Sequence, residues 1–396
     1  MSKLDRFRKV LAATTPHPLG LEVSKAKGSY IYDSQKKAYL DFVAGVSAVS
    51  IGHSNRVIRK AVHQQLKRHS HVIVYGEFIQ EAVLNYAEFL TAQLHPSLNS
   101  VYLVNSGTEA IEGALKLARA ATKRTEIIAA KNNYHGNTMG SLSLMDYEER
   151  VAPFRPLIPD IKHIQFNQPE DLDAITDSTA AVIVETIQGG AGFIIPKASY
   201  LSTLKKRCQE KGALLILDEI QPGFGRTGTL FAYEQFECVP DILVIGKGMA
   251  GGLPVGAFIA NSALMNTLSH SPKLGHITTF GGHPVIAAAA HATLRFILEN
   301  ELPSKSLAHE KTIRKFLKHH LIKEIRGRGL MLALILEDEK VTNFLVLEAL
   351  KRQLILFWLL YEKRAVRLTP PLTISKKEIE KGCQLILEIL DDYTVN

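Results

Sequence analysis

The sequence predicts an α/β fold, with a mostly parallel sheet between layers of helices and a smaller α+β domain built from the two ends of the chain. Three observations lead to this prediction. Short apolar runs recur through the middle of the chain, helix-like stretches separate them, and longer helical stretches replace this pattern after about residue 285. Buried strands that alternate with helices are typical of parallel sheets, because each crossover lays a helix on a sheet face.

The individual elements follow from the same patterns. A strand–turn–strand pattern over residues 27–42 should pack with the C-terminal domain. Six buried strands are expected at residues 101–104, 127–130, 180–185, 214–218, 242–245 and 257–260. Helices are expected at 109–122, 199–211, 286–299 and 306–324. The domains expected are an N-terminal segment 1–45 that packs with the small domain, a large domain 46–285 and a small domain 286–396.

Composition narrows the class of protein. Of 396 residues, 46% are hydrophobic and 22% are charged, which is ordinary globular usage. The longest apolar run, 354–360, is far shorter than the about 20 residues that span a bilayer, so no membrane partner is expected. No secretory signal is visible at the N-terminus. The 3 cysteines are widely spaced and the 15 histidines show no ligand spacing, which favours the cytoplasm and no metal site.

The net charge of +8 permits anionic partners without choosing among them. The densest basic run, 311–329, has apolar residues at helical spacing and is interpreted as an amphipathic helix with a solvated face. Nucleic-acid binding is the alternative interpretation. It is disfavoured because no aromatic stacking series and no nucleic-acid motif accompany the run.

A possible anion site follows the strand at 101–104. Ligands of open parallel sheets bind beyond the carboxyl ends of the strands. There, Ser106, Gly107 and Thr108 open a helix, and the backbone N–H groups and helix dipole would suit a phosphate. The alternative is a plain helix cap.

Two charged residues follow other strands. Asp218 ends the strand at 214–218, and a buried carboxylate needs a cationic or protonated partner. Its alternative role is structural, paired with backbone or with Arg226. Lys247 follows the strand at 242–245 between two glycines; it is either a solvated lysine or a desolvated amine able to act as a nucleophile.

Together these groups match the needs of pyridoxal 5′-phosphate, whose phosphate, ring nitrogen and aldehyde require an anion cradle, an acid and a lysine. A competing dinucleotide pattern, G-x-G-x-x-G, begins at Gly246. It lacks the helix and the acidic residue about 20 positions later that such a site needs.

Seven motifs occur in order along the chain: SGTEA, YHG, DEIQPGFGRTG, IGKGMAGGLPVGA, TTFGG, RGRGLM and VRLTPPL. From about residue 28 to about residue 389, the chain resembles the class III, or ornithine and ω-amino acid, branch of pyridoxal-phosphate aminotransferases. The resemblance implies a fold-type I transferase that works as a homodimer. It also implies ping-pong transfer of an amino group, expected to be an ω-amino group, to a 2-oxo acid such as 2-oxoglutarate or pyruvate.

The resemblance implies roles for single residues. Lys247 would bond to the cofactor aldehyde and move the reacting proton, and Asp218 would pair with the ring nitrogen. Arg367 looks like the arginine that binds a substrate carboxylate. The remaining cofactor contacts implied are Gly107 and Thr108 at the phosphate, with Ser106 beside them, Tyr134 stacked on the ring, Ile220 packed against it, Gln221 near the phenolic oxygen, and Thr279 at the phosphate of the neighbouring subunit.

Four positions depart from the ornithine pattern. Asn137, in the substrate site, stands where ornithine-type members have an arginine, and Gly190 stands where a glutamate closes off the carboxylate-binding arginine. Pro16 and Val46 occupy the positions of two tyrosines of an ornithine-specific pocket. Ornithine is therefore expected to be a poor donor. The apolar stretch 354–363 approaches the substrate entrance in the family, and a core strand is its alternative interpretation.

Two other functions stay open from the sequence alone. One is an aminomutase, racemase or decarboxylase on the same cofactor and fold. The other is a non-catalytic pyridoxal-binding protein. The TTFGGHP segment resembles aminotransferases more than mutases, and the presence of Lys247 and Asp218 favours catalysis.

Overall fold

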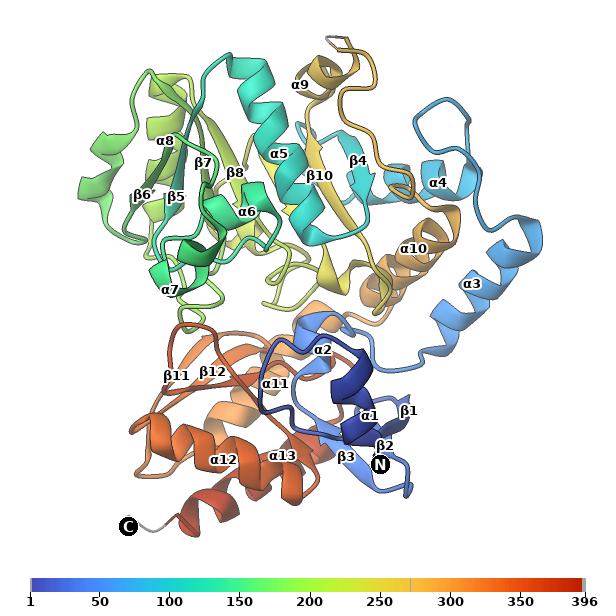
Figure 1. The fold of residues 1–396 in the computed structure, drawn as a ribbon, viewed down its shortest axis with the longest axis vertical. Helices are drawn as coiled ribbons and strands as arrows, with labels where there is room; N and C mark the ends of the chain where they lie inside the picture. The colour runs from blue at the N-terminus through green and yellow to red at the C-terminus, as the bar shows by residue number, and fades with distance from the viewer. Residues whose placement is uncertain (1, 271, 394–396) are drawn as a thin grey trace.

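A seven-stranded sheet forms the centre of the computed structural model, which describes residues 2–270 and 272–393 (Figure 1). Its strand order is β4-β10-β9-β8-β7-β5-β6. Strand β10 is antiparallel to β4 and β9, and the pairings from β9 through β8, β7 and β5 to β6 are parallel. The predicted, mostly parallel sheet is confirmed. The strands are β4 (Ser100–Val104), β5 (Glu126–Ala130), β6 (Ile161–Ile164), β7 (Thr179–Glu185), β8 (Leu214–Asp218), β9 (Ile242–Ile245) and β10 (Gly256–Ala260).

Both faces of this sheet are buried, which explains why its strands are continuous apolar runs in the sequence. In β8, Ile216 belongs to the core under α5, whereas Leu215 and Leu217 belong to the core on the opposite face. Helix α5 packs on β9 and β10, and α8 packs on β7 and β8. The helices around the sheet are α3 (Arg56–Arg68), α4 (Glu81–Thr91), α5 (Gly107–Thr122), α6 (Met139–Ser143), α7 (Glu148–Val151), α8 (Tyr200–Lys211), α9 (Ser262–Met265) and α10 (Pro284–Glu299).

The two ends of the chain meet below this sheet in the view of Figure 1. Strand β3 pairs in parallel with β13, so Leu40 lies opposite Leu354, and a second four-stranded sheet has the order β11-β12-β15-β14. The elements here are α1 (Lys3–Val10), β1 (Val23–Lys27), β2 (Tyr30–Asp33), β3 (Ala38–Asp41), α2 (Ala44–Ser47), α11 (Leu302–Phe316), β11 (Ile322–Arg328), β12 (Met331–Leu336), α12 (Glu339–Lys351), β13 (Leu354–Ile355), β14 (Phe357–Trp358), β15 (Ala365–Leu368) and α13 (Lys376–Asp391). The expected division into 1–45, 46–285 and 286–396 stays a prediction.

Short 3₁₀ helices complete the chain: η1 (Ala152–Phe154), η2 (Pro169–Ala174), η3 (Ala232–Gln235), η4 (Lys247–Ala250) and η5 (Asn266–Ser269). Among the helices of residues 2–270 and 272–393, none combines the length and the apolar character that crossing a bilayer requires.

The predicted helices at 306–324 and 311–329 are wrong in their second halves. Helix α11 ends at Phe316, and the chain continues as β11, which pairs antiparallel with β12. This pairing is with residues later in the chain, so helical spacing within the run could not reveal it. Arg314 of the basic run donates to the carbonyl of Gly327 at 2.7 Å and pairs with Glu310 at 2.7 Å.

Helix α5 packs closely on β10 at Gly113, and this packing determines the effect of a substitution there on stability. Replacing glycine by alanine inside a helix ordinarily stabilises by about 0.5–1 kcal/mol. At Gly113, however, a Cβ atom would lie 2.2 Å from Cε1 of Phe258. We expect Gly113→Ala to lower the free energy of unfolding by about 1–3 kcal/mol, because overpacking outweighs helix propensity. Urea unfolding measures it, and Phe258→Leu should reduce the cost; a stabilised Gly113→Ala protein would contradict the packing.

Candidate active site

A cavity of about 610 Å³ lies at the carboxyl ends of β8 and β9. Residues from both the seven-stranded sheet and the C-terminal strands line it, as ligand sites of open sheets do. Of the predicted site residues, the structure brings together Gly107, Thr108, Tyr134, Asn137, Asp218, Ile220, Gln221, Lys247 and Arg367. Val46, Gly190 and Leu360, which the resemblance places near the substrate, also line the cavity. The lining residues without a predicted role are His135, Gly136, Arg150, Glu185 and Pro222.

Asp218 is only 3% exposed at the end of β8. Its Oδ2 lies 2.7 Å from Nδ1 of His135, and its Oδ1 accepts a hydrogen bond from the N–H of Ile220 at 2.9 Å. The partner that the buried carboxylate requires is therefore the histidine of the YHG motif, which sequence reasoning missed. Its position directly after Tyr134 was the only signal.

Arg226 is not the partner of Asp218, contrary to the alternative interpretation. Its guanidinium is fully buried and donates to the carbonyls of Leu330 at 3.1 Å and Pro370 at 2.6 Å, and to Oγ of Ser50 at 3.1 Å. Burial lowers the pKa of Arg226 to about 9. This arginine ties together chain segments that are distant in sequence.

Lys247 begins η4 immediately after β9, in a left-handed backbone conformation with φ of 40°. Non-glycine residues adopt this region at a cost and concentrate there at functional sites. Burial lowers the pKa of Lys247, and the charge of Asp218 offsets part of that effect. A larger share of its side chain is therefore the uncharged, nucleophilic amine than in an exposed lysine.

The N-terminus of helix α5 faces the cavity, and neighbouring side chains approach closely there at two glycines, Gly107 and Gly136. A Cβ atom on Gly107 would lie 2.8 Å from Cδ1 of Ile220, and one on Gly136 would lie 2.2 Å from Oγ1 of Thr108. Gly136 also has φ of 136°, which favours glycine. Backbone N–H groups and the dipole of a 16-residue helix suit an anion here.

Two predicted residues lie outside the lining of the cavity. Ser106 caps α5, and its Oγ accepts a hydrogen bond from the N–H of Glu109 at 3.3 Å. Thr279 is exposed in the segment between residues 272 and 283. Their roles toward the cofactor stay predictions.

Arg367 lies on β15, between β12 and β14, and is 8% exposed. Among the described residues, its Nε and Nη1 have no hydrogen-bond partner, and its guanidinium lies 5.8 Å from the ring centre of Phe193. Burial lowers the pKa of Arg367 to about 10. A buried cation without a partner is costly, so this side chain is suited to an anion that enters the cavity.

Gly190, which lines the same cavity, lies so close to Tyr361 that a side chain at this position would collide with the Tyr361 ring. A Cβ atom at this position would lie 2.9 Å from Cδ2 of Tyr361, whose backbone N–H donates to the carbonyl of Gly190 at 3.0 Å. Leu360, next along the stretch 354–363, lines the cavity. That stretch thus forms strands β13 and β14 and then reaches the site.

The other predicted side chains form local contacts. The amide of Asn137 donates to the hydroxyl of Tyr134 at 3.1 Å, and burial raises the pKa of Tyr134. The amide of Gln221 lies 3.4 Å from Oγ of Ser47. Glu185 accepts from the N–H of Gly189 at 2.9 Å, and burial raises its pKa to about 7.

A left-handed turn over Ala44–Ser47 contributes Val46 to the cavity. Four consecutive residues have φ between 50° and 68°. A β-branched valine in this conformation costs about 1–3 kcal/mol, and the cost is tolerated only where surrounding contacts impose it. Oδ1 of Asp41 accepts from the N–H groups of Val43 and Ala44 and holds the turn in place.

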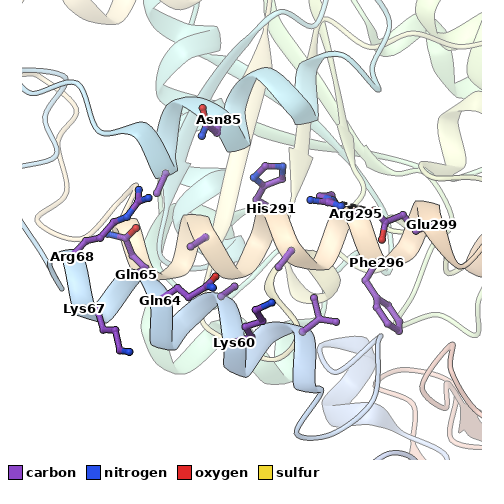
Figure 2. Close-up of a pocket in the computed structure, with 15 residues that line it drawn as sticks. Lys60, Gln64, Gln65, Lys67, Arg68, Asn85, His291, Arg295, Phe296 and Glu299 are labelled. Atoms are coloured by element: carbon purple, nitrogen blue, oxygen red, sulfur yellow. Dashed lines mark hydrogen bonds and ion pairs between the residues drawn. The ribbon is translucent and has the colours of Figure 1, made fainter.

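A second hollow, of about 810 Å³, lies between α3, α4 and α10 (Figure 2). Long polar side chains on helix surfaces form its walls. Its two arginines already have partners, since Arg68 lies 3.0 Å from Glu81 and Arg295 lies 2.7 Å from Glu299. It holds no strand end and none of the predicted site residues, so the chemistry belongs to the cavity around Lys247.

Comparison with known proteins agrees with this geometry. The family described as Aminotransferase class-III matches residues 11–390. The chain belongs to the class III aminotransferases. It is 37% identical to an acetylornithine aminotransferase of Methanopyrus kandleri over 92% of each chain. It is 36% identical to that of Bacillus subtilis, over 94% of this chain and 96% of the other.

A solved structure supports the same fold assignment. The ornithine aminotransferase of Toxoplasma gondii superposes with a TM-score of 0.90 at 30% identity, covering 98% of this chain and 94% of that one. The predicted fold and family are confirmed. Class III aminotransferases depend on pyridoxal 5′-phosphate, which is therefore the cofactor, and an amino donor and a 2-oxo acid are the substrates. The buried Asp218, the lysine beside it and the narrow helix N-terminus fit that cofactor.

Proposed function

We propose that this class III aminotransferase takes the amino group of a donor with a terminal amine and gives it to a 2-oxo acid, with Lys247 and Asp218 as its catalytic residues. The observation that carries the proposal is the convergence of three groups on one cavity. A lysine of lowered pKa, a buried carboxylate and a buried arginine whose Nε and Nη1 have no partner among the described residues all face it.

Each residue has a task that its surroundings support. Pyridoxal phosphate, when bound, supplies an electron sink for the substrate carbon that loses its proton. The amine of Lys247 would hold the cofactor covalently and, once released, would accept and return that proton. Asp218, whose Oδ2 contacts His135, would pair with the ring nitrogen and keep it protonated. Gly107 and Thr108 would bind the phosphate, with Ser106 beside them. Tyr134 and Ile220 would contact the ring, and Gln221 would lie near its phenolic oxygen.

Arg367 sets the substrate requirement in this proposal. With glycine at position 190, no acidic side chain from that position closes off the guanidinium. Arg367 is then free for a carboxylate in both halves of the reaction. Asn137 supplies no positive charge, so ornithine should bind poorly compared with donors that carry fewer charges.

The substrate proposal predicts a kinetic pattern. With 2-oxoglutarate or pyruvate as acceptor, ornithine should show a kcat/KM well below that of at least one of N-acetylornithine, 4-aminobutyrate or a simple amine. Arg367→Ala should lower kcat/KM for the 2-oxo acid about 100-fold, mainly through KM, because one charged contact to a desolvated carboxylate is lost. Steady-state kinetics measures both.

Arg364→Ala provides the matched control, because Arg364 is exposed on the same segment and pairs with Glu362 at 3.0 Å. It should leave the kinetics unchanged. If ornithine with 2-oxoglutarate is the best pair by a wide margin, or if Arg367→Ala behaves like Arg364→Ala, the substrate proposal is wrong.

We also propose that the enzyme is a homodimer in which Thr279 serves the phosphate of the neighbouring subunit. Exposed apolar side chains gather on two segments that meet where His71 lies 5.0 Å from the ring of Phe280. They are Ile73, Phe78 and Ile79 on one segment and Leu274, Ile277 and Phe280 on the other. A patch of this kind is typical of protein interfaces. Thr279 is exposed on the second segment, directly before Phe280.

Mixed dimers test this arrangement. Thr279→Ala should weaken cofactor binding, and Lys247→Ala should be inactive. Co-expressed, these chains form a mixed dimer in which one site keeps its own Lys247 and receives Thr279 from the other chain. Activity at limiting cofactor should therefore exceed that of either parent. When Thr279→Ala is co-expressed with the double variant Lys247→Ala/Thr279→Ala, activity should not exceed that of the parents. If co-expression of Thr279→Ala with Lys247→Ala also gives no gain in activity, Thr279 does not act across subunits.

The cytoplasm is the proposed location. All three cysteines, Cys208, Cys238 and Cys383, are buried free thiols, which suits a reducing compartment.

A further inference from the structure

Arg150 is a second cation in the wall of the active-site cavity. It lies on α7 and lines the same cavity as Arg367, yet its side chain is exposed, whereas that of Arg367 is buried. The cavity therefore has one guanidinium in its interior and one at its solvent side.

Within the described ranges 2–270 and 272–393, the guanidinium of Arg150 has no ion pair and no hydrogen bond; only its backbone N–H is engaged, with the carbonyl of Tyr147 at 2.9 Å. The neighbouring acids have other contacts. Glu148 pairs with Arg155 at 2.7 Å, and Asp146 accepts from the N–H of Asn132 at 2.7 Å. The charge of Arg150 is thus available to a ligand.

The position of Arg150 is set by packing on both sides. The next residue, Val151, is 2% exposed in a small apolar cluster. Tyr147, on the preceding turn, has its ring 5.2 Å from that of Tyr361, whose hydroxyl donates to the carbonyl of Asn133 at 2.8 Å. Helix α7 is therefore held against the stretch that carries Leu360 into the cavity.

The acidic groups of the cavity leave both arginines unneutralised. Asp218 pairs with His135, and Glu185 accepts from two backbone N–H groups. Asn137 has no charge and donates to Tyr134. A substrate with one carboxylate can neutralise Arg367 alone, whereas a substrate with a carboxylate at each end can neutralise both arginines.

We propose that Arg150 binds the distal carboxylate of the substrate, so that the preferred 2-oxo acid is a dicarboxylic one. The proposal rests on the proposed function and deepens it. Arg150 lies on a different element from Asn137, and its charge does not favour ornithine, because it would repel the ammonium group that ornithine carries beside its distal carboxylate. A guanidinium that is partly in solvent serves this purpose, because it can release the substrate in each half-reaction.

The test uses the holoenzyme with Arg150→Gln, and Arg155→Gln as the matched control. Arg155 is exposed, lies five residues along and does not line the cavity. With one common donor, the ratio of kcat/KM for 2-oxoglutarate to that for pyruvate should fall about 10- to 100-fold in Arg150→Gln, through KM, and stay unchanged in Arg155→Gln. Arg150→Lys should recover part of the ratio.

A binding measurement separates this inference from the proposed function. Isothermal calorimetry measures the affinities of glutarate and of butyrate, which lacks the second carboxylate. Neither compound has an oxo group, so neither can react. Wild type should bind glutarate at least tenfold more tightly, and Arg150→Gln should lose that preference. If these binding results are obtained but no 2-oxo acid is turned over, the proposed function is wrong and the assignment of a carboxylate site to Arg150 is still supported. An unchanged acceptor ratio, or a glutarate preference that survives Arg150→Gln, overturns the inference.

Discussion

Burial of the Asp218 carboxylate at the end of a central strand is the constraint on which the site depends. A charge in this position costs several kcal/mol unless partners compensate it. His135 and the N–H of Ile220 provide that compensation, at 2.7 Å and 2.9 Å. The histidine must therefore reach across from the loop after β5, and that loop also carries Tyr134, Gly136 and Asn137 into the cavity.

The same cavity requires both ends of the chain. Lys247 and Asp218 come from the seven-stranded sheet, Val46 from the N-terminal left-handed turn, and Arg367 from the C-terminal strand β15. Arg226 holds these regions together, because it donates to carbonyls of Leu330 and Pro370 and to Ser50. A shift of one region would separate the carboxylate-binding arginine from the reacting lysine, so the interaction links folding to substrate binding.

The spacing of apolar residues along the sequence predicted the strands of the central sheet well. It predicted poorly those features that depend on contacts between distant parts of the chain. The six predicted strands agree with β4, β5, β7, β8, β9 and β10 to within about a residue, because strands buried on both faces are continuous apolar runs. The helix predicted to continue to residue 324 ends at Phe316, because the chain turns over 317–321 and then pairs as β11 (Ile322–Arg328) with β12, which comes later in the sequence. The sequence predicted that the buried Asp218 needs a partner, but it did not predict that this partner is His135 and not Arg226. Arg150 and the turn at Val46 had no sequence signal, since their roles arise from elements that meet only in the fold.

The central claim is that Lys247 is the residue that holds the cofactor. The most direct measurement is borohydride reduction of the holoenzyme, followed by proteolysis and mass spectrometry of the peptides. The account predicts a pyridoxyl group on the peptide that contains Lys247 and on no other lysine at stoichiometric yield. A stoichiometric label on a different lysine, or a holoenzyme that transaminates yet carries no label after reduction, would contradict it.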